Sequence, residues 1–195
     1  MSYGRPEAAT APGYILSISQ SLAQLAAAGV TVFASSGDGG SNSTQGTYGS
    51  YSATAPLYVS YPASDVDVTG VGGTQLDFDA TWNVTGETVW SDMASTLSAS
   101  GGGVSMIFQR PSWQSGGAVL AGQSMRCVPD VAAISVALAP AAGIPQGNDT
   151  VLTGEFMALT VLNGQNFGFA GTSLATPVWA AVGALINQAL SLIHI

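Results

Sequence analysis

The sequence has few charged residues, and positive charge is the scarcest. Its 195 residues contain three arginines, no lysine and one histidine, against eleven aspartates and glutamates, so the formal net charge at pH 7 is −8. A surface that binds nucleic acid needs clustered positive charge to neutralise phosphates, and this composition speaks against such a partner. An acidic chain is compatible with work in acid, where carboxylates take up protons and the net charge falls toward zero.

Cysteine and long hydrophobic runs are also scarce. Cys127 is the only cysteine, so no disulfide can form within the chain. The sequence contains no apolar run of the length that spans a bilayer and no signal-peptide pattern, and we predict no membrane partner. Three Asn-X-Ser/Thr triplets, at Asn42, Asn83 and Asn148, are compatible with secretion, although such triplets often arise by chance in chains rich in Ser and Thr.

Apolar residues and glycine are abundant. Apolar residues make up 47% of the chain, and 25 residues are glycine, a composition that argues against disorder and for many tight turns. The apolar spacing predicts a helix over 13–28, a stop at Gly29 and a buried strand over 30–34. Helix, glycine and strand in this order are typical of a parallel α/β sheet, and the length suffices for one domain with a sizeable core.

Two polar stretches follow predicted strands. Ser35-Ser36-Gly37-Asp38-Gly39-Gly40 comes directly after the first strand, where α/β folds place their chemistry, although Asp beside Gly is also a common turn residue. Near the C-terminus, Ser173 precedes an apolar helical run, with Pro177 expected in its first turn. From the local sequence alone, Ser173 or Thr172 is more often a simple helix N-cap.

The segment Gly171-Thr172-Ser173, followed by three residues and Pro177, resembles the nucleophile motif shared by subtilisin-like proteases and sedolisins, the serine-carboxyl peptidases. The resemblance extends over nearly the whole chain, through Ser2-Tyr3-Gly4, Ser36-Gly37-Asp38, Tyr61-Pro62-Ala63-Ser64, Val71-Gly72-Gly73-Thr74, Gly101-Gly102-Gly103 and Pro129-Asp130. Two features favour the sedolisins. The loop at Asp38 carries aspartate where subtilisins have asparagine, and the only histidine, His194, follows Ser173 instead of preceding it in a His-Gly-Thr segment.

The resemblance implies an α/β fold with a subtilisin-like parallel sheet flanked by helices, incomplete because N-terminal and C-terminal parts of the domain are missing. Residues 1–190 would be a partial peptidase catalytic domain and residues 191–195 a tail outside the family pattern. It further implies that Ser173 is the nucleophile and that Asp38 completes the oxyanion hole. A carboxylate would repel the developing oxyanion, whereas a protonated carboxyl group can donate a hydrogen bond to it, so an acid pH optimum is expected.

The resemblance also implies where the substrate binds. The segment Ser2-Tyr3-Gly4 would border an extended peptide as an added strand, and Gly102 and Gly103 would let backbones approach closely near the cleft. For Asp130 we expect a structural role. Asp65, Asp67, Asp77 and Asp79 alternate around one predicted strand, and we interpret them as a solvated face in preference to a metal site.

Two departures from the family pattern matter for activity. The sedolisin base is a Glu with an Asp four residues later, on a helix before the Ser-Tyr/Trp-Gly strand, and Glu7 follows that strand and has no such Asp. The family's calcium site lies beyond the serine helix, where this sequence has no carboxylate. We therefore expect an acid-acting endopeptidase or tripeptidyl peptidase, extracellular or lysosomal/vacuolar and made with a propeptide, whose isolated 195 residues have little activity. A non-catalytic peptide-binding homologue and a subtilisin-like protease remain the alternatives.

Overall fold

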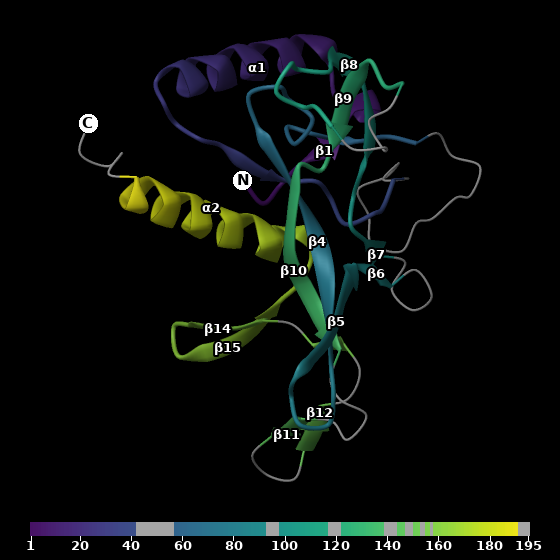
Figure 1. Ribbon diagram of the computed structural model, residues 1–195, viewed down its shortest axis with the longest axis vertical. Coiled ribbons are helices and arrows are strands. Elements are labelled where there is room, and N and C mark those ends of the chain that lie inside the picture. Colours follow the sequence, from purple (N-terminus) through teal and green to yellow (C-terminus); the bar gives the residue numbers. More distant parts are fainter. Residues whose placement is uncertain are drawn as a thin grey trace.

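A mainly parallel sheet forms the centre of the molecule (Figure 1). The computed structural model describes residues 1–41, 57–92, 98–116, 122–138, 144–146, 150–152, 155–156 and 158–190. The strand order is β13 (Glu155–Phe156), β10 (Val131–Leu138), β4 (Thr69–Phe78) and β2 (Phe33–Ser35), and β5 (Val84–Val89) pairs with β4. Strands β10, β4 and β2 are parallel, whereas β13 and β5 are antiparallel to their neighbours. The predicted α/β class with a parallel sheet is confirmed.

Helices α1 (Pro12–Ala27) and α2 (Thr172–Ala189) cover opposite faces of this sheet. Successive side chains of a strand point to opposite faces. Phe33 of β2 points toward α2, because a Cβ atom added at Gly183 would lie 3.1 Å from its ring. The next residue, Ala34, is fully buried in a core that includes Ile15 and Leu22 of α1. The helices that the sequence predicts to flank the sheet therefore do so.

Buried apolar side chains form a core between α1 and the sheet. Tyr61 belongs to it, with its ring stacked on Phe108 at 6.1 Å and its hydroxyl donating to the carbonyl of Ile15 at 3.1 Å. Burying such side chains contributes roughly 25 cal/mol for each Å² of apolar surface removed from water. The buried members of this core are Ile15, Leu22, Ala34, Val59, Tyr61, Ala63, Val68 and Val128.

The predicted boundaries of α1 are confirmed to within one residue. Gly29 ends the helix with φ at +77°, a conformation that side chains with a Cβ atom rarely adopt. The N–H of Val30 then donates to the carbonyl of Leu25 and closes the helix end. The following strand is shorter than predicted because Val30, which is 47% exposed, belongs to this closing turn.

The remaining described elements are short. They are β1 (Arg5–Pro6) paired with β3 (Ser60–Tyr61), the 3-10 helix η1 (Glu7–Ala9), β6 (Ser91–Asp92) with β7 (Ser98–Ala99), β8 (Gly103–Gln109) with β9 (Met125–Val128), β11 (Ile144–Gln146) with β12 (Thr150–Leu152), and β14 (Ala158–Leu162) with β15 (Gln165–Phe169). The glycine-rich and polar stretch before Ser173 has strand-like pieces at 156–161 and 167–170 in the sequence, and the hairpin β14–β15 forms there. Residues 41–56 are rich in Ser, Thr, Gly, Tyr and Ala, which predicts a surface loop, and all of them except Ser41 lie outside the described residues.

The interpretation of the four alternating aspartates as a solvated strand face is wrong for Asp65. Strand β4 begins only at Thr69, and Asp65 lies in the preceding turn, where it is fully buried. Its Oδ1 accepts the N–H of Asp67 at 3.0 Å. Asp79, by contrast, is only partly buried. Within the described ranges, no group of three His, Cys, Asp or Glu side chains is arranged to hold a metal ion.

Helix α2 is buried only in its first turns. Thr172, Ala175 and Thr176 are buried, whereas Leu185 and Ile186 are 64% and 48% exposed. The helix predicted after Ser173 is therefore present, but its apolar spacing does not lead to burial of its second half. Among the parts of the chain that the structure describes, no helix is long and apolar enough to cross a membrane.

Candidate active site

Ser173 lies in the first turn of α2, half-buried and next to the N-terminal segment. Its Oγ donates to the carbonyl oxygen of Ser2 at 3.1 Å. The N-cap residue is Gly171, with φ at +87° and no side chain to offer, so neither Thr172 nor Ser173 is the N-cap that local sequence favours. The hydroxyl of Ser173 is therefore not used to cap its own helix.

Asp38 reaches the start of α2 from the loop after β2. Its Oδ1 accepts the backbone N–H of Thr172 at 2.8 Å and the Thr172 hydroxyl, also at 2.8 Å, across 134 residues of sequence. A Cβ atom at Gly171 would lie 2.6 Å from Asp38 Oδ2, so only glycine permits this approach. The two predicted catalytic residues, Asp38 and Ser173, are brought to the same helix end.

Pro177 lies in the second turn of α2 and not in the first, where the sequence predicted it. A helical residue normally donates its N–H to the carbonyl four residues earlier, and proline has no N–H. The carbonyl of Ser173 therefore lacks that intrahelical donor, and it accepts the Ser2 hydroxyl at 3.0 Å instead. Ser2 and Ser173 are thus joined by two reciprocal hydrogen bonds.

The predicted substrate-binding segment Ser2-Tyr3-Gly4 lies beside this site. Met1 pairs with the edge of β2, since its amino group donates to Phe33 O at 2.6 Å and its carbonyl accepts the N–H of Ser35 at 3.0 Å. The Tyr3 side chain is 73% exposed. A Cβ atom at Gly4 would come within 3.0 Å of the Tyr61 carbonyl oxygen, so this position favours glycine.

The triple glycine packs directly against the Asp38 loop. Gly101 N–H donates to the Gly37 carbonyl at 2.7 Å, and a Cβ atom at Gly101 would lie 2.1 Å from the carbonyl oxygen of Ser36. Gly102 and Gly103, the two predicted to bind substrate, follow at once and lie against Val128 O and Val59, respectively. The close backbone approach predicted here is present. Its tightest point is Gly101, which the sequence analysis did not single out.

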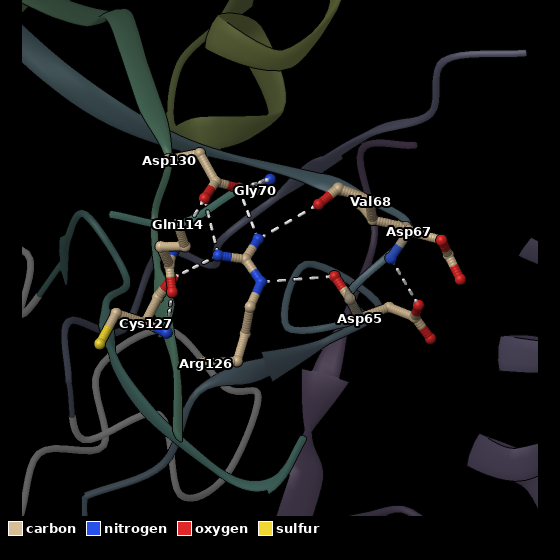
Figure 2. A network of polar contacts seen from close by, with 8 residues as sticks. All are labelled: Asp65, Asp67, Val68, Gly70, Gln114, Arg126, Cys127 and Asp130. Carbon is tan, nitrogen blue, oxygen red and sulfur yellow. Dashed lines mark hydrogen bonds and ion pairs between the residues drawn. The ribbon is translucent and has the colours of Figure 1, made fainter. Parts of the chain in front are cut away.

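A second polar network holds the amino-terminal side of the sheet (Figure 2). Arg126 is fully buried, and its guanidinium donates to both carboxylate oxygens of Asp130, at 2.6 and 2.5 Å. It also donates to the carbonyl of Val68 at 3.2 Å and stacks over the Trp113 ring at 4.9 Å. Asp130 Oδ2 in turn accepts the N–H of Gly70 at 2.8 Å. This geometry agrees with the structural role expected for Asp130.

Glu7 is buried away from bulk water and bound to β8. One carboxylate oxygen accepts the hydroxyl of Ser105 at 2.6 Å, and the other accepts the N–H of Met106 at 2.9 Å. Both oxygens therefore serve to fasten η1 to β8. His194 lies outside the described residues.

The geometry of this site can be compared with known proteins. A family model described as the subtilase family matches residues 1–192. The chain is a subtilase. This subtilase is 36% identical over 197 residues to kumamolisin of Bacillus sp. (strain MN-32), a match that covers 97% of the chain, and 34% identical to sedolisin of Pseudomonas sp. (strain 101), a match that covers 94%. It is also 30% identical to tripeptidyl-peptidase 1 of Homo sapiens.

A solved structure of Pseudomonas sedolisin, described as a serine-carboxyl proteinase complexed with two molecules of pseudo-iodotyrostatin, superposes on the subtilase with a TM-score of 0.74. The two are 33% identical, and the match covers 98% of this chain and 47% of that one. The sedolisin resemblance and the subtilisin-like fold are therefore confirmed. The chain spans 31%, 28% and 30% of the lengths of kumamolisin, sedolisin and human tripeptidyl-peptidase 1.

Proposed function

We propose that this subtilase carries the nucleophile and one oxyanion donor of an acid-acting serine peptidase, an endopeptidase or a tripeptidyl peptidase. Ser173 is the nucleophile, and Asp38 is the donor. The observation that carries the proposal is the pair of hydrogen bonds between Asp38 Oδ1 and Thr172, the residue before Ser173. They hold a carboxyl group at the start of the helix that presents the serine.

The chemistry gives each residue a defined part. Ser173 Oγ attacks the carbonyl carbon of the scissile peptide, and the carbonyl electron pair moves onto its oxygen. Asp38, when protonated, donates a hydrogen bond to that oxygen but keeps its proton. Ser2, Tyr3 and Gly4 would border the substrate backbone, with Gly102 and Gly103 on the other side. Oxyanion donors of this kind contribute about a hundredfold to a thousandfold in turnover.

The serine proton must pass to a base, and the 195 residues contain no Glu with an Asp four residues later. Losing one member of a catalytic unit can cost nearly as much as losing them all. We therefore propose that this chain by itself turns over peptides slowly or not at all. The second candidate function is a homologue that binds peptides without cleaving them, and sequence upstream of residue 1 that also lacks such a Glu and Asp pair would support it.

We extend the proposal to the environment of the protein. An acid-dependent donor suits an extracellular or lysosomal/vacuolar compartment, and the family resemblance adds a propeptide and a calcium ion. The residues of this chain do not fit the family's calcium site, because no carboxylate follows Ser173. The proposed chemistry therefore contains no step through calcium.

A peptide aldehyde with an isotope-labelled carbonyl carbon tests the proposal without requiring turnover. The serine oxygen adds to the aldehyde carbon, and the serine proton ends on the former carbonyl oxygen, so a neutral hemiacetal forms with a distinct NMR signal. We expect this adduct at about pH 4, a weaker one at about pH 7, and none in Ser173→Ala.

Asp38→Asn is the informative companion variant, because an amide donates hydrogen bonds at every pH. We expect its adduct to form equally well at both pH values. A wild-type chain that binds the aldehyde without forming a hemiacetal would favour the non-catalytic alternative. An adduct that survives in Ser173→Ala would exclude Ser173 as the nucleophile.

A further inference from the structure

We infer that Thr172 is a positioning residue that decides which oxygen of Asp38 carries the proton. By donating to Oδ1 from both its backbone and its side chain, Thr172 places the acidic proton on Oδ2. This inference rests on the proposed function, since it concerns the donor that the function requires. Thr172 itself is not proposed to contact the reacting atoms.

The first step of the argument is the backbone bond. The N–H of Thr172 can only donate, so Asp38 Oδ1 must accept at 2.8 Å. Thr172 occupies the first helical position after the Gly171 N-cap, where N–H groups have no partner within the helix. Oδ1 therefore faces the positive end of the α2 dipole, which favours an unprotonated oxygen at that place.

The second step is the direction of the hydroxyl bond. Thr172 Oγ1 accepts the N–H of Gly37 at 3.2 Å and lies 2.8 Å from Asp38 Oδ1. With the N–H of Gly37 on one of its lone pairs, the hydroxyl can point its only proton at Oδ1. The opposite direction would need Oδ1 to carry a proton while it also accepts the N–H of Thr172. An oxygen that accepts two hydrogen bonds is a poor place for a proton, so the two bonds from Thr172 favour protonation at Oδ2.

The third step is the rigidity of the arrangement. Thr172 is fully buried, and its carbonyl accepts the hydroxyl of Thr176 at 2.7 Å. Gly171 leaves room for Asp38 Oδ2, which would lie 2.6 Å from a Cβ atom there. The carboxyl group is thus held with Oδ1 on the helix end and Oδ2 over Gly171. A donor fixed in this way needs no reorganisation when charge develops on the substrate.

The test replaces the hydroxyl while keeping the shape of the side chain. Thr172→Val removes the hydroxyl group, which donates to Asp38 Oδ1 and accepts the N–H of Gly37, and leaves the backbone N–H in place. Thr172→Ser keeps the hydroxyl group. Thr176→Val is the matched control, because that hydroxyl is equally buried in the same helix and bonds only its own backbone turn. Thermal unfolding of all three variants shows how much each loses in stability alone.

The readout is the NMR signal of the Asp38 carboxyl carbon, followed through an acid titration of the whole chain. Hydrogen bonds donated to a carboxylate favour its charged form. If Thr172 donates to Oδ1, the midpoint of this titration moves to higher pH in Thr172→Val and stays near the wild-type value in Thr172→Ser and Thr176→Val. If the hydroxyl accepts a proton from Asp38, the midpoint moves to lower pH. A lower or unchanged midpoint overturns the inference.

The labelled aldehyde gives the second readout. At about pH 4 we expect Thr172→Val to bind it about tenfold more weakly, the effect of one misplaced hydrogen bond, and Thr172→Ser to bind like the wild type. Equal affinity in Thr172→Val overturns the positioning role. If the wild-type chain forms no hemiacetal at all, the proposed function fails, and the carboxyl titration still decides the direction of the Thr172 bond. Should Thr172→Val not fold, Thr172→Ala with the same titration takes its place.

Discussion

Asp38 and Asp130 have similar hydrogen-bond partners and lie at opposite ends of the parallel strands. Each accepts a backbone N–H at 2.8 Å from a distant segment, Asp38 from Thr172 and Asp130 from Gly70. The second donor differs, because Asp130 meets the charged guanidinium of Arg126 and Asp38 meets the neutral hydroxyl of Thr172. Asp38 follows a parallel strand and Asp130 precedes one. The carboxyl ends of parallel strands are where such sheets bind ligands. The place of Asp38 therefore suits the proposed oxyanion donor, and the place of Asp130 suits a structural role.

The largest effect should come from Asp130→Asn. This change leaves the fully buried charge of Arg126 without its counter-ion, and breaking a buried pair from one side typically costs about 3–5 kcal/mol of folding free energy. Denaturant unfolding of the variant and the wild type measures the difference. A loss below about 1 kcal/mol would remove the contrast between the two aspartates, because Asp130 would then be no more structural than a surface ion pair.

Gly171→Ala should have the next largest effect. The residue has φ at +87°, and an added Cβ atom would lie 2.6 Å from Asp38 Oδ2. Holding a non-glycine residue in such a conformation costs about 1–3 kcal/mol, and the displaced carboxyl group should also abolish the aldehyde adduct. Gly164→Ala is the control for backbone strain alone, because its φ is +75° and no atom lies within 4 Å of an added Cβ atom. Retention of the adduct in Gly171→Ala would show that the approach of Asp38 is not tight.

Asp38→Asn should change stability little, by no more than about 0.5 kcal/mol. The amide oxygen can replace Oδ1 as the acceptor of both Thr172 donors. The same denaturant experiment, run beside Asp130→Asn, measures this difference directly. A loss as large as that of Asp130→Asn would mean that the fold depends on the charge of Asp38.

The smallest effect should come from Asp79, a partly exposed carboxylate in the turn after β4. Hydrogen bonds from the Thr81 hydroxyl and from Asn83 and Thr81 N–H groups lower the pKa of Asp79 from 3.8 to about 2. A lowered pKa means that the charged form stabilises the turn at higher pH and that this contribution fades as the pH falls from about 4 to about 2. The melting temperatures of wild type and Asp79→Asn should differ slightly at neutral pH and converge at about pH 2. A gap that persists in acid would contradict this.

Much of the fold follows from local patterns in the sequence. The apolar spacing of α1, its stop at Gly29 and the strand that follows depend on neighbouring residues, and so they are predictable. Asp65 was misplaced because alternation of aspartate in a turn resembles alternation in a strand. Its backbone carbonyl accepts Arg126 Nε at 3.5 Å, a contact across sixty-one residues that the local pattern does not contain. The exposed second half of α2 has the same apolar spacing as a buried helix, and spacing alone does not say what covers it.

In the candidate site, too, local patterns were predictable and contacts between distant segments were not. Ser173 and Asp38 were predicted from a family resemblance, since nothing within either segment shows that they meet. Thr172 and Gly101 were missed, although each stands inside a motif that the analysis quoted, because their contacts are made with Asp38 and Ser36, more than sixty residues away in the chain. Short motifs identify candidate site residues, whereas the arrangement of the strands determines which of them are in contact.

The missing N–H of Pro177 has one more consequence. Proline opens one carbonyl four residues before it, and moving it to position 176 or 178 would open the carbonyl of Thr172 or Leu174 instead. Only a proline at 177 gives Ser2 an acceptor on the backbone of Ser173 itself. The spacing of serine and proline in this helix therefore determines which carbonyl is available to Ser2. The amino-terminal segment can bind to the backbone of Ser173 because the carbonyl of Ser173, and not its hydroxyl group, accepts the hydrogen bond from Ser2.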